Sequence, residues 1–144
     1  MELEREGYVL SDDRSLLDVP QIYRWLSGDS YWAKGRPYDV AVRSIDESEC
    51  VGVYAESDGS QVAFARLVTD RSTFAWLCDV YVAPEHRGRG LGHWLVRACI
   101  EDEDLLGTVS RVLLATHDAH QVYADIGFVP LTEPERWMEL RREM

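Results

Sequence analysis

Cysteine is scarce in this 144-residue chain and follows no recurring pattern. Cys50, Cys78 and Cys99 are odd in number, and each lies in an apolar stretch without the close spacing of metal ligands. Such a set argues against both a disulfide framework and a zinc-binding motif. We therefore expect three reduced core residues in a cytoplasmic protein, with no metal site and no catalytic thiol.

Long hydrophobic runs and an excess of positive charge are also missing. No apolar run approaches the ~20 residues that cross a bilayer, and the first six residues are too polar for a signal peptide. The chain has 15 lysine and arginine residues against 26 aspartate and glutamate residues, a net charge of -11. This charge repels phosphate backbones at long range. We expect neither a membrane nor a nucleic acid as partner, whereas a cationic amine would suit this surface.

What the chain does contain is typical of a globular protein. Hydrophobic residues make up 46% and charged residues 28% of the sequence. A chain of this length can bury one substantial core and is too short for two ordinary domains. We expect a single domain over residues 1–144. The sequence does not determine the oligomeric state, and a homodimer is compatible with it.

A strand, a glycine-rich turn and a helix follow one another in residues 73–100, and the function is best argued from this segment. Residues 73–82 are rich in β-branched and aromatic side chains, and the strand ends at Pro84, which cannot donate a ladder hydrogen bond. After Gly90, apolar residues recur at helical spacing, as Leu91, Trp94, Leu95, Ala98 and Cys99. A helix therefore begins at the glycines.

The turn itself has the chemistry of an anion site. Its sequence is Arg87-Gly88-Arg89-Gly90-Leu91-Gly92. Glycines allow positive φ and a close approach of the backbone to a ligand, while free amides and the helix dipole attract a phosphate. The turn lacks the lysine of a Walker loop, and its G-x-G-x-G spacing does not match the dinucleotide fingerprint. A different phosphate-bearing ligand is indicated.

Two motifs carry a resemblance to a known family. Arg87, Gly90 and Gly92 fill the pattern [Gln/Arg]-x-x-Gly-x-[Gly/Ala], which resembles the coenzyme A pyrophosphate loop of the GNAT acetyltransferase superfamily. About thirty residues later, Tyr123-Ala-Asp-Ile-Gly127-Phe128 resembles the family's Tyr-x-x-x-Gly-Phe segment. The resemblance covers about residues 51–129 with these motifs. It implies acetyl-coenzyme A as co-substrate, bound by residues 87–92.

Taken in order, the elements predict a GNAT-like α/β (α+β) fold with a mixed, mostly antiparallel sheet of about six to seven strands and about four helices. Residues 56–60 contain an Asp-Gly turn typical of a hairpin, and consecutive antiparallel strands lead into the glycine loop. We expect a helix after Pro37 with Val40 and Ala41 turned inward. Further strands are expected at 8–10, 51–55, 61–69, 111–115, from Phe128, and at 137–140, and further helices from Val19 and at 117–126.

The resemblance also assigns candidate roles in acyl transfer. It implies that the central strand splays from its neighbour at Val80, Tyr81 and Val82, which frees amides for the acetyl oxygen and the pantetheine arm. It implies that Tyr123 is the general acid, a phenol that protonates the departing thiolate. In many relatives an asparagine near residue 116 contacts coenzyme A. Here the sequence is Thr116-His117-Asp118, so we expect Thr116 to make an altered contact.

Other candidates follow from unusual residues. Aspartate is rare in strands, so Asp79 should face a polar cleft or a cation. It is a candidate base for the amine, a candidate electrostatic binder of the amine, or a structural partner of an arginine such as Arg66. Tyr31 and Trp32, in a polar connection, either shape a substrate pocket or cap the core. His117, Asp118 and His120 lie close together in the sequence as metal ligands can, but we expect no metal there, and the histidines could instead shuttle protons.

Together these features predict an acetyl-coenzyme A-dependent N-acetyltransferase that acts on the primary amine of a small molecule through a ternary complex. Two alternatives stay open at this point. One is a non-catalytic acyl-coenzyme A-binding or sensing module, although Tyr123 counts against it. The other is an acetyltransferase for protein lysines or N-termini, because acceptor loops have no readable code.

Overall fold

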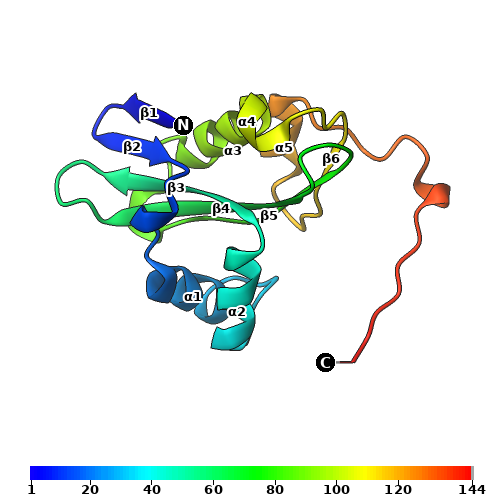
Figure 1. Ribbon diagram of the computed structural model, residues 1–144, viewed down its shortest axis with the longest axis horizontal. Coiled ribbons are helices and arrows are strands. Elements are labelled where there is room, and N and C mark those ends of the chain that lie inside the picture. Colours follow the sequence, from blue (N-terminus) through cyan, green and yellow to red (C-terminus); the bar gives the residue numbers. More distant parts are fainter. Residues whose placement is uncertain (144) are drawn as a thin grey trace.

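A central sheet carries helices on both of its faces in the computed structural model, which describes residues 1–143 (Figure 1). The strands are β1 (Glu2–Arg5), β2 (Tyr8–Ser11), β3 (Glu49–Ala55), β4 (Gln61–Thr69), β5 (Ala75–Val82) and β6 (Val112–Leu113). The helices are α1 (Val19–Gly28), α2 (Tyr38–Asp46), α3 (Leu91–Glu101), α4 (Glu103–Leu106) and α5 (His120–Ile126). Three 3₁₀ turns, η1 (Arg14–Leu16), η2 (Pro84–His86) and η3 (Pro134–Arg136), join them.

The strands pair in chain order, β1-β2-β3-β4-β5-β6. The pairs from β1 to β5 are antiparallel, and only β5 and β6 are parallel, joined through α3. The β3–β4 hairpin turns at Gly59, whose φ of 74° fits the Asp-Gly turn expected there. The predicted fold class, a mixed and mostly antiparallel sheet with flanking helices, is therefore confirmed.

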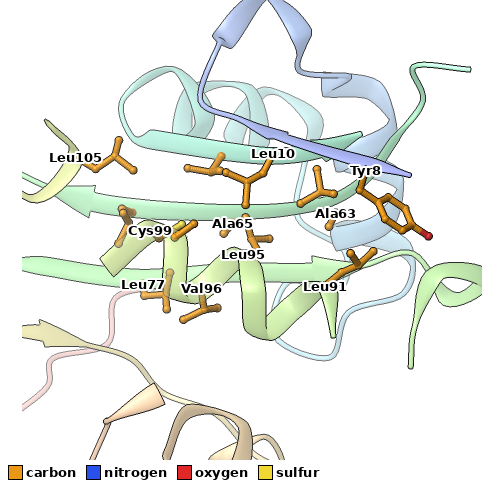
Figure 2. Close-up of a cluster of buried hydrophobic side chains, with 14 of the residues drawn as sticks. Tyr8, Leu10, Ala63, Ala65, Leu77, Leu91, Leu95, Val96, Cys99 and Leu105 are labelled. Atoms are coloured by element: carbon orange, nitrogen blue, oxygen red, sulfur yellow. The ribbon is translucent and has the colours of Figure 1, made fainter. Parts of the chain in front are cut away.

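Two apolar clusters fix the helices on the sheet. On one face, α3 packs its buried side chains, Leu91, Leu95, Val96 and Cys99 among them, against Leu10, Ala63, Ala65 and Leu77 of the strands (Figure 2). On the other face, α1 and α2 contribute a second cluster with Ile22, Trp25, Ile45 and Phe64. Asp18 caps α1 by accepting a hydrogen bond from the Gln21 amide at 3.1 Å, as its position before Pro20 predicts.

Several expectations were wrong in detail. Strand β1 was not expected, because its sequence is polar. In the structure all four of its residues are exposed. Val40 is 44% exposed and does not face the core, although Ala41 does. Strand β6 has two residues instead of five. Residues 128–129 and 137–140 form no strand, since no strand lies beside them in the described part of the chain; all of them are exposed except Phe128, which is half-buried.

Gly107 offers a stability test away from the site. Its φ is 58°, and a Cβ there would lie 2.1 Å from the carbonyl oxygen of Arg71. We expect Gly107→Ala to lower the free energy of unfolding by about 2 kcal/mol or more, because backbone must move. Gly28→Ala, where nothing lies within 4 Å, is the matched control and should stay within about 0.5 kcal/mol of wild type or above it. Equal urea-unfolding midpoints for the two variants would contradict this reading.

Candidate active site

A bulge in β5 sets the geometry of the site. Phe64 of β4 lies opposite Tyr81, and Arg66 lies opposite Cys78, so Ala65 faces both Asp79 and Val80. The chain accommodates this extra residue at Asp79, whose φ of 52° is left-handed. The bulge also reverses which residues of β5 point to which face of the sheet. Ala75 and Leu77 belong to the α3-side cluster, whereas Tyr81 and Ala83, at the same alternation, belong to the α1-side cluster.

Beyond the bulge, one edge of β5 is open. Strand β6 pairs with β5 only at Ala75 and Trp76, and no other described strand follows on that side. The amide of Ala83 donates to the carbonyl of Val62 at 2.8 Å, so the alternating amides of Val80 and Val82 point to the open edge. The β5–β6 pairing thus ends after Trp76, ahead of Val80–Val82, where the splay was predicted. This edge offers unpaired donors to a carbonyl oxygen.

The glycine loop lies at the carboxyl end of β5. Gly88 and Gly90 have φ of 80° and 75°, and Gly90 precedes the first turn of α3 in the left-handed conformation. No side chain caps α3, so the amides of its first turn are free for an anion. Leu91 is buried beneath the loop, and Gly92 lies 3.6 Å from Val82 as measured from an added Cβ. The local structure is that of a phosphate-binding turn.

Three arginines lie at this loop, two of them within it and one from β1. Arg87 donates from Nε to the carbonyl of Val82 at 2.9 Å, and Arg89 donates to the Tyr8 hydroxyl at 2.7 Å. Arg5 was not predicted as part of the site; it donates to the carbonyl of Gly90 at 3.3 Å. The local excess of positive charge would attract a pyrophosphate to a protein that is otherwise acidic. No sequence pattern points to Arg5, because 85 residues separate it from Gly90.

A cavity of about 680 Å³ opens beside the bulge. It gathers candidates from distant parts of the sequence, namely Tyr31, Trp32, Asp79, Val80, Thr116 and Tyr123. Arg36, Arg66 and His117 also line it. The loop residues Arg87 to Gly92 do not line this cavity and lie past the end of β5. The open edge of β5 thus runs from a cavity with polar and aromatic walls toward an anion-binding turn.

Asp79 is held by two arginines and a tryptophan. Its carboxylate accepts from Arg36 at 2.8 and 3.3 Å, from Arg66 at 2.9 Å, and from Nε1 of Trp32 at 2.9 Å. Burial raises the pKa of the carboxyl, but hydrogen bonds and charge from Arg36 and Arg66 outweigh burial and hold the pKa below its usual value. Such a carboxylate is a weak base. The geometry matches the alternative in which Asp79 pairs with arginines, and it argues against Asp79 as the base.

Tyr31 and Trp32 form an aromatic wall of the cavity and do not cap the core. They are 49% and 41% exposed, and their rings pack edge to face at 5.1 Å. The Tyr31 hydroxyl accepts a hydrogen bond from the backbone amide of His117 at 2.8 Å, and its ring lies 4.8 Å from the His117 ring. With Trp32 bonded to Asp79, the connection between α1 and α2 is tied to both sides of the cavity.

Tyr123 lines the cavity from α5. Gly127, with a φ of 123°, ends the helix, and the Phe128 amide bonds back to the carbonyl of Tyr123 at 3.0 Å. The rings of Tyr123 and Phe128 pack edge to face, with their centroids 5.8 Å apart. Burial, with smaller contributions from Tyr31 and Asp118, raises the pKa of Tyr123 to about 12. The phenol is therefore protonated at neutral pH, as a general acid must be.

The thiols are poor nucleophiles. Burial raises the pKa of Cys78, which lines the cavity, to about 11, and those of Cys50 and Cys99 to about 12. Within residues 1–143, no three or more His, Cys, Asp or Glu side chains are grouped to hold a metal ion. Over the same residues, no helix combines the length and apolar character needed to cross a membrane.

A bulged strand whose open edge runs from a cavity with a protonated tyrosine toward an anion-binding turn is the arrangement expected of an acyltransferase that uses a coenzyme A thioester. The model of the acetyltransferase (GNAT) family matches residues 19–128, and the chain belongs to this family. Its members use an acyl-coenzyme A donor to acylate amines.

Individual relatives agree with this assignment. A crystal structure of a candidate GNAT acetyltransferase from Xanthomonas campestris pv. campestris is 47% identical, with a TM-score of 0.88 over 94% of this chain and 93% of that one. A candidate acetyltransferase of Gibberella zeae is 35% identical over 83% of this chain and 77% of its own length. The N-acetylglutamate synthase of Neisseria gonorrhoeae, solved with coenzyme A and N-acetyl-glutamate, shares the fold at 19% identity, with a TM-score of 0.72 over 92% of this chain and 30% of that one.

Proposed function

We propose that this protein transfers the acetyl group of acetyl-coenzyme A directly to the primary amine of a small molecule. The observation that carries the proposal is the open edge of β5, which joins the anion-binding turn to the cavity that contains Tyr123. A thioester lying along this edge would have its phosphates at the turn, its carbonyl beside the free amides of β5, and its sulfur near Tyr123.

The donor would be held mainly by backbone. The amides of residues 88–92 and the side chains of Arg87 and Arg89 would bind the pyrophosphate. The amides of Val80 and Val82 would bond the acetyl oxygen and the pantetheine arm. The backbone amide of Tyr81, between them, faces β4 instead. Thr116 faces the same cavity and would contact the donor where relatives use asparagine. Backbone donors fixed in advance favour the oxyanion of the tetrahedral intermediate.

Proton transfer would complete the reaction. The neutral amine attacks the thioester carbon, the C–N bond forms, and the C–S bond breaks as the intermediate collapses. Tyr123 gives its phenolic proton to the departing sulfur and regains one from solvent. The amine's proton leaves through water or the imidazole of His117, which lines the cavity. Asp79 takes no proton; it positions Trp32 and Arg36 in the acceptor wall.

The cavity supports a small-molecule acceptor. Its volume of about 680 Å³, which the donor end beside Val80 and Thr116 shares, lies within the ~300–1,000 Å³ of sites that enclose small ligands. Two aromatic side chains, Tyr31 and Trp32, offer flat apolar contact to such an acceptor. The acetylated amino acid bound to the Neisseria gonorrhoeae relative belongs to the same size class.

The test is release of coenzyme A thiol from acetyl-coenzyme A across a panel of arylamines, polyamines, amino acids, aminoglycosides and lysine peptides. We expect release that depends on a small amine, with the acetylated amine found by mass spectrometry. Release with lysine peptides alone would point to a protein acetyltransferase. Tight acetyl-coenzyme A binding without release for any amine would favour a non-catalytic binding module.

Donor binding can be tested at Gly90 with a matched control. A β-branched residue at a φ of 75° is strained, so Gly90→Val should distort the turn and raise the Kd for coenzyme A by about tenfold or more. Gly59→Val carries the same strain, with a φ of 74°, in the remote β3–β4 hairpin. It should lower stability and leave the Kd unchanged. Calorimetric titration that finds equal affinities for the two variants would remove the loop from the donor site.

A further inference from the structure

Positive charge gathers in the acceptor cavity, although the net charge of the protein is -11. Two guanidiniums, those of Arg36 and Arg66, share the single carboxylate of Asp79, so this group of side chains keeps one positive charge in excess. The other formally charged residues of the lining, Asp118 and Arg141, are both exposed and opposite in sign, so they leave this excess in place. The cavity thus has the opposite sign to the protein as a whole.

The Asp79 carboxylate has no capacity left for a cationic substrate. It accepts two hydrogen bonds from Arg36, one from Arg66 and one from Trp32. These contacts use about the full number of hydrogen bonds that a carboxylate can accept. An ammonium group that entered the cavity would therefore meet guanidiniums before it could meet this carboxylate, and like charges repel. The charge of the cavity favours an anionic group on the acceptor.

The two arginines, in contrast, keep donors for an anion. Arg66 bonds Asp79 through Nε and the Ser48 hydroxyl through Nη1, and its Nη2 has no partner among the described residues. Within residues 1–143, the only buried side-chain nitrogen or oxygen without a partner is the Tyr54 hydroxyl, so Nη2 of Arg66 is not sealed in the core. Arg36 bonds Asp79 through its two terminal nitrogens, which leaves Nε. Both guanidiniums line the cavity and can bond a ligand there.

We infer that the acceptor carries a carboxylate beside its primary amine, as an amino acid does, and that Arg36 and Arg66 bind this carboxylate. The inference rests on the proposed function and specifies its substrate class. A guanidinium matches a carboxylate in charge and in planar geometry. An acceptor without an anionic group would take water from the two guanidiniums and give them no counter-charge in return, which is costly for partly buried cations.

The position of the arginines fits a short spacer between the carboxylate and the amine. Asp79, which both arginines bond, directly precedes Val80, whose amide would bind the acetyl oxygen. A carboxylate held at the arginines would therefore lie close to an amine that attacks the acetyl carbon. Tyr31 adds a further donor to the cavity, because its hydroxyl accepts a hydrogen bond from a backbone amide and keeps its own proton to donate.

The first test compares matched acceptors on the native chain. These are the common amino acids, their amides, the amines that decarboxylation leaves, and phosphoethanolamine. We expect kcat/KM for coenzyme A thiol release to be at least about tenfold higher for the best amino acid than for its amide or its decarboxylated amine. Equal values for the three, or a preference for phosphoethanolamine over every amino acid, would overturn the inference and leave the proposed function intact.

Binding can be measured without turnover, which separates the inference from the proposed function. Calorimetric titration of the protein saturated with coenzyme A should give a Kd for the best amino acid at least about tenfold lower than for its amide. Amino acid binding without acetyl transfer would support the anion site and contradict the proposed function. Absence of binding for every amino acid would overturn the inference.

Arg36→Gln tests the arginine pair directly. It removes the excess charge and leaves Arg66 to hold Asp79. The ratio of kcat/KM for the amino acid to that for its decarboxylated amine should fall by about tenfold or more. Arg43→Gln, at an exposed position on α2 outside the cavity, is the matched control and should keep the native ratio.

Arg36→Lys provides a second variant at the same position, which retains the charge and a partner for Asp79 if Arg36→Gln fails to fold. Because an ammonium lacks the planar fork, the ratio should fall here too, but by less than in Arg36→Gln. A native ratio in both variants, with folding confirmed by circular dichroism, would overturn the inference.

Discussion

Tyr123→Phe is expected to lower kcat by about 100-fold or more while the Kd for coenzyme A stays within about twofold. The phenyl ring keeps the packing against Phe128 at 5.8 Å and loses only the hydroxyl. Because that hydroxyl would act as the thiolate departs, its loss raises the barrier without weakening ground-state binding. Steady-state rates and calorimetric titration of the same preparations separate the two effects.

Tyr38→Phe is the matched control, since Tyr38 lies on α2 and packs on Tyr23 away from the acceptor cavity. It should keep wild-type kcat.

The pH profile of kcat gives a second readout of the role of Tyr123. With the pKa of Tyr123 raised to about 12, the acid form persists on the alkaline side, so this group should produce no loss of kcat between about pH 7 and pH 10. Unchanged kcat in Tyr123→Phe would remove its acid role.

Asp79→Ala is expected to lower the free energy of unfolding by about 3–5 kcal/mol, because it leaves Arg36 and Arg66 without their shared carboxylate. The Asp79 side chain is 2% exposed, and those of Arg66 and Arg36 are 12% and 20% exposed, so water cannot replace it fully. Urea unfolding measures the difference. Glu49→Gln, which breaks the exposed pair with Arg71, is the control and should cost less than about 1 kcal/mol.

The same carboxylate predicts an acid dependence of stability. The folded-state pKa of Asp79 is lowered, so its contribution is fully present above its unfolded pKa of about 4 and is lost as the pH falls through the folded value. The gap in unfolding free energy between wild type and Asp79→Asn should therefore narrow only at acid pH. A gap that narrows as the pH rises above neutrality would contradict the ion-pair assignment.

The local part of the site could be predicted because short segments determine it. The strand–loop–helix around Arg87 to Gly92 follows from β-branched residues, glycine spacing and a helical stripe that lie next to one another in the chain. The end of α5 at Gly127 follows in the same way, since only a residue tolerant of positive φ continues there.

The long-range part could not be predicted. Asp79 was recognisable as unusual, but nothing in the sequence identifies Arg36, 43 residues away, as one of its partners. The bulge depends on a register shift against Ala65 that only pairing between β4 and β5 can set. Residues 137–140 alternate as a strand does, yet a strand needs a neighbour, and none lies beside them in the described part of the chain.

Direct transfer is tested most plainly by initial rates measured over a grid of acetyl-coenzyme A and the best amine from the panel. A ternary complex with no covalent enzyme intermediate predicts double-reciprocal lines that intersect, with one coenzyme A thiol released for each acetylated amine. The high thiol pKa values agree with this prediction. Parallel lines, with acetyl-enzyme trapped in the absence of amine, would contradict it.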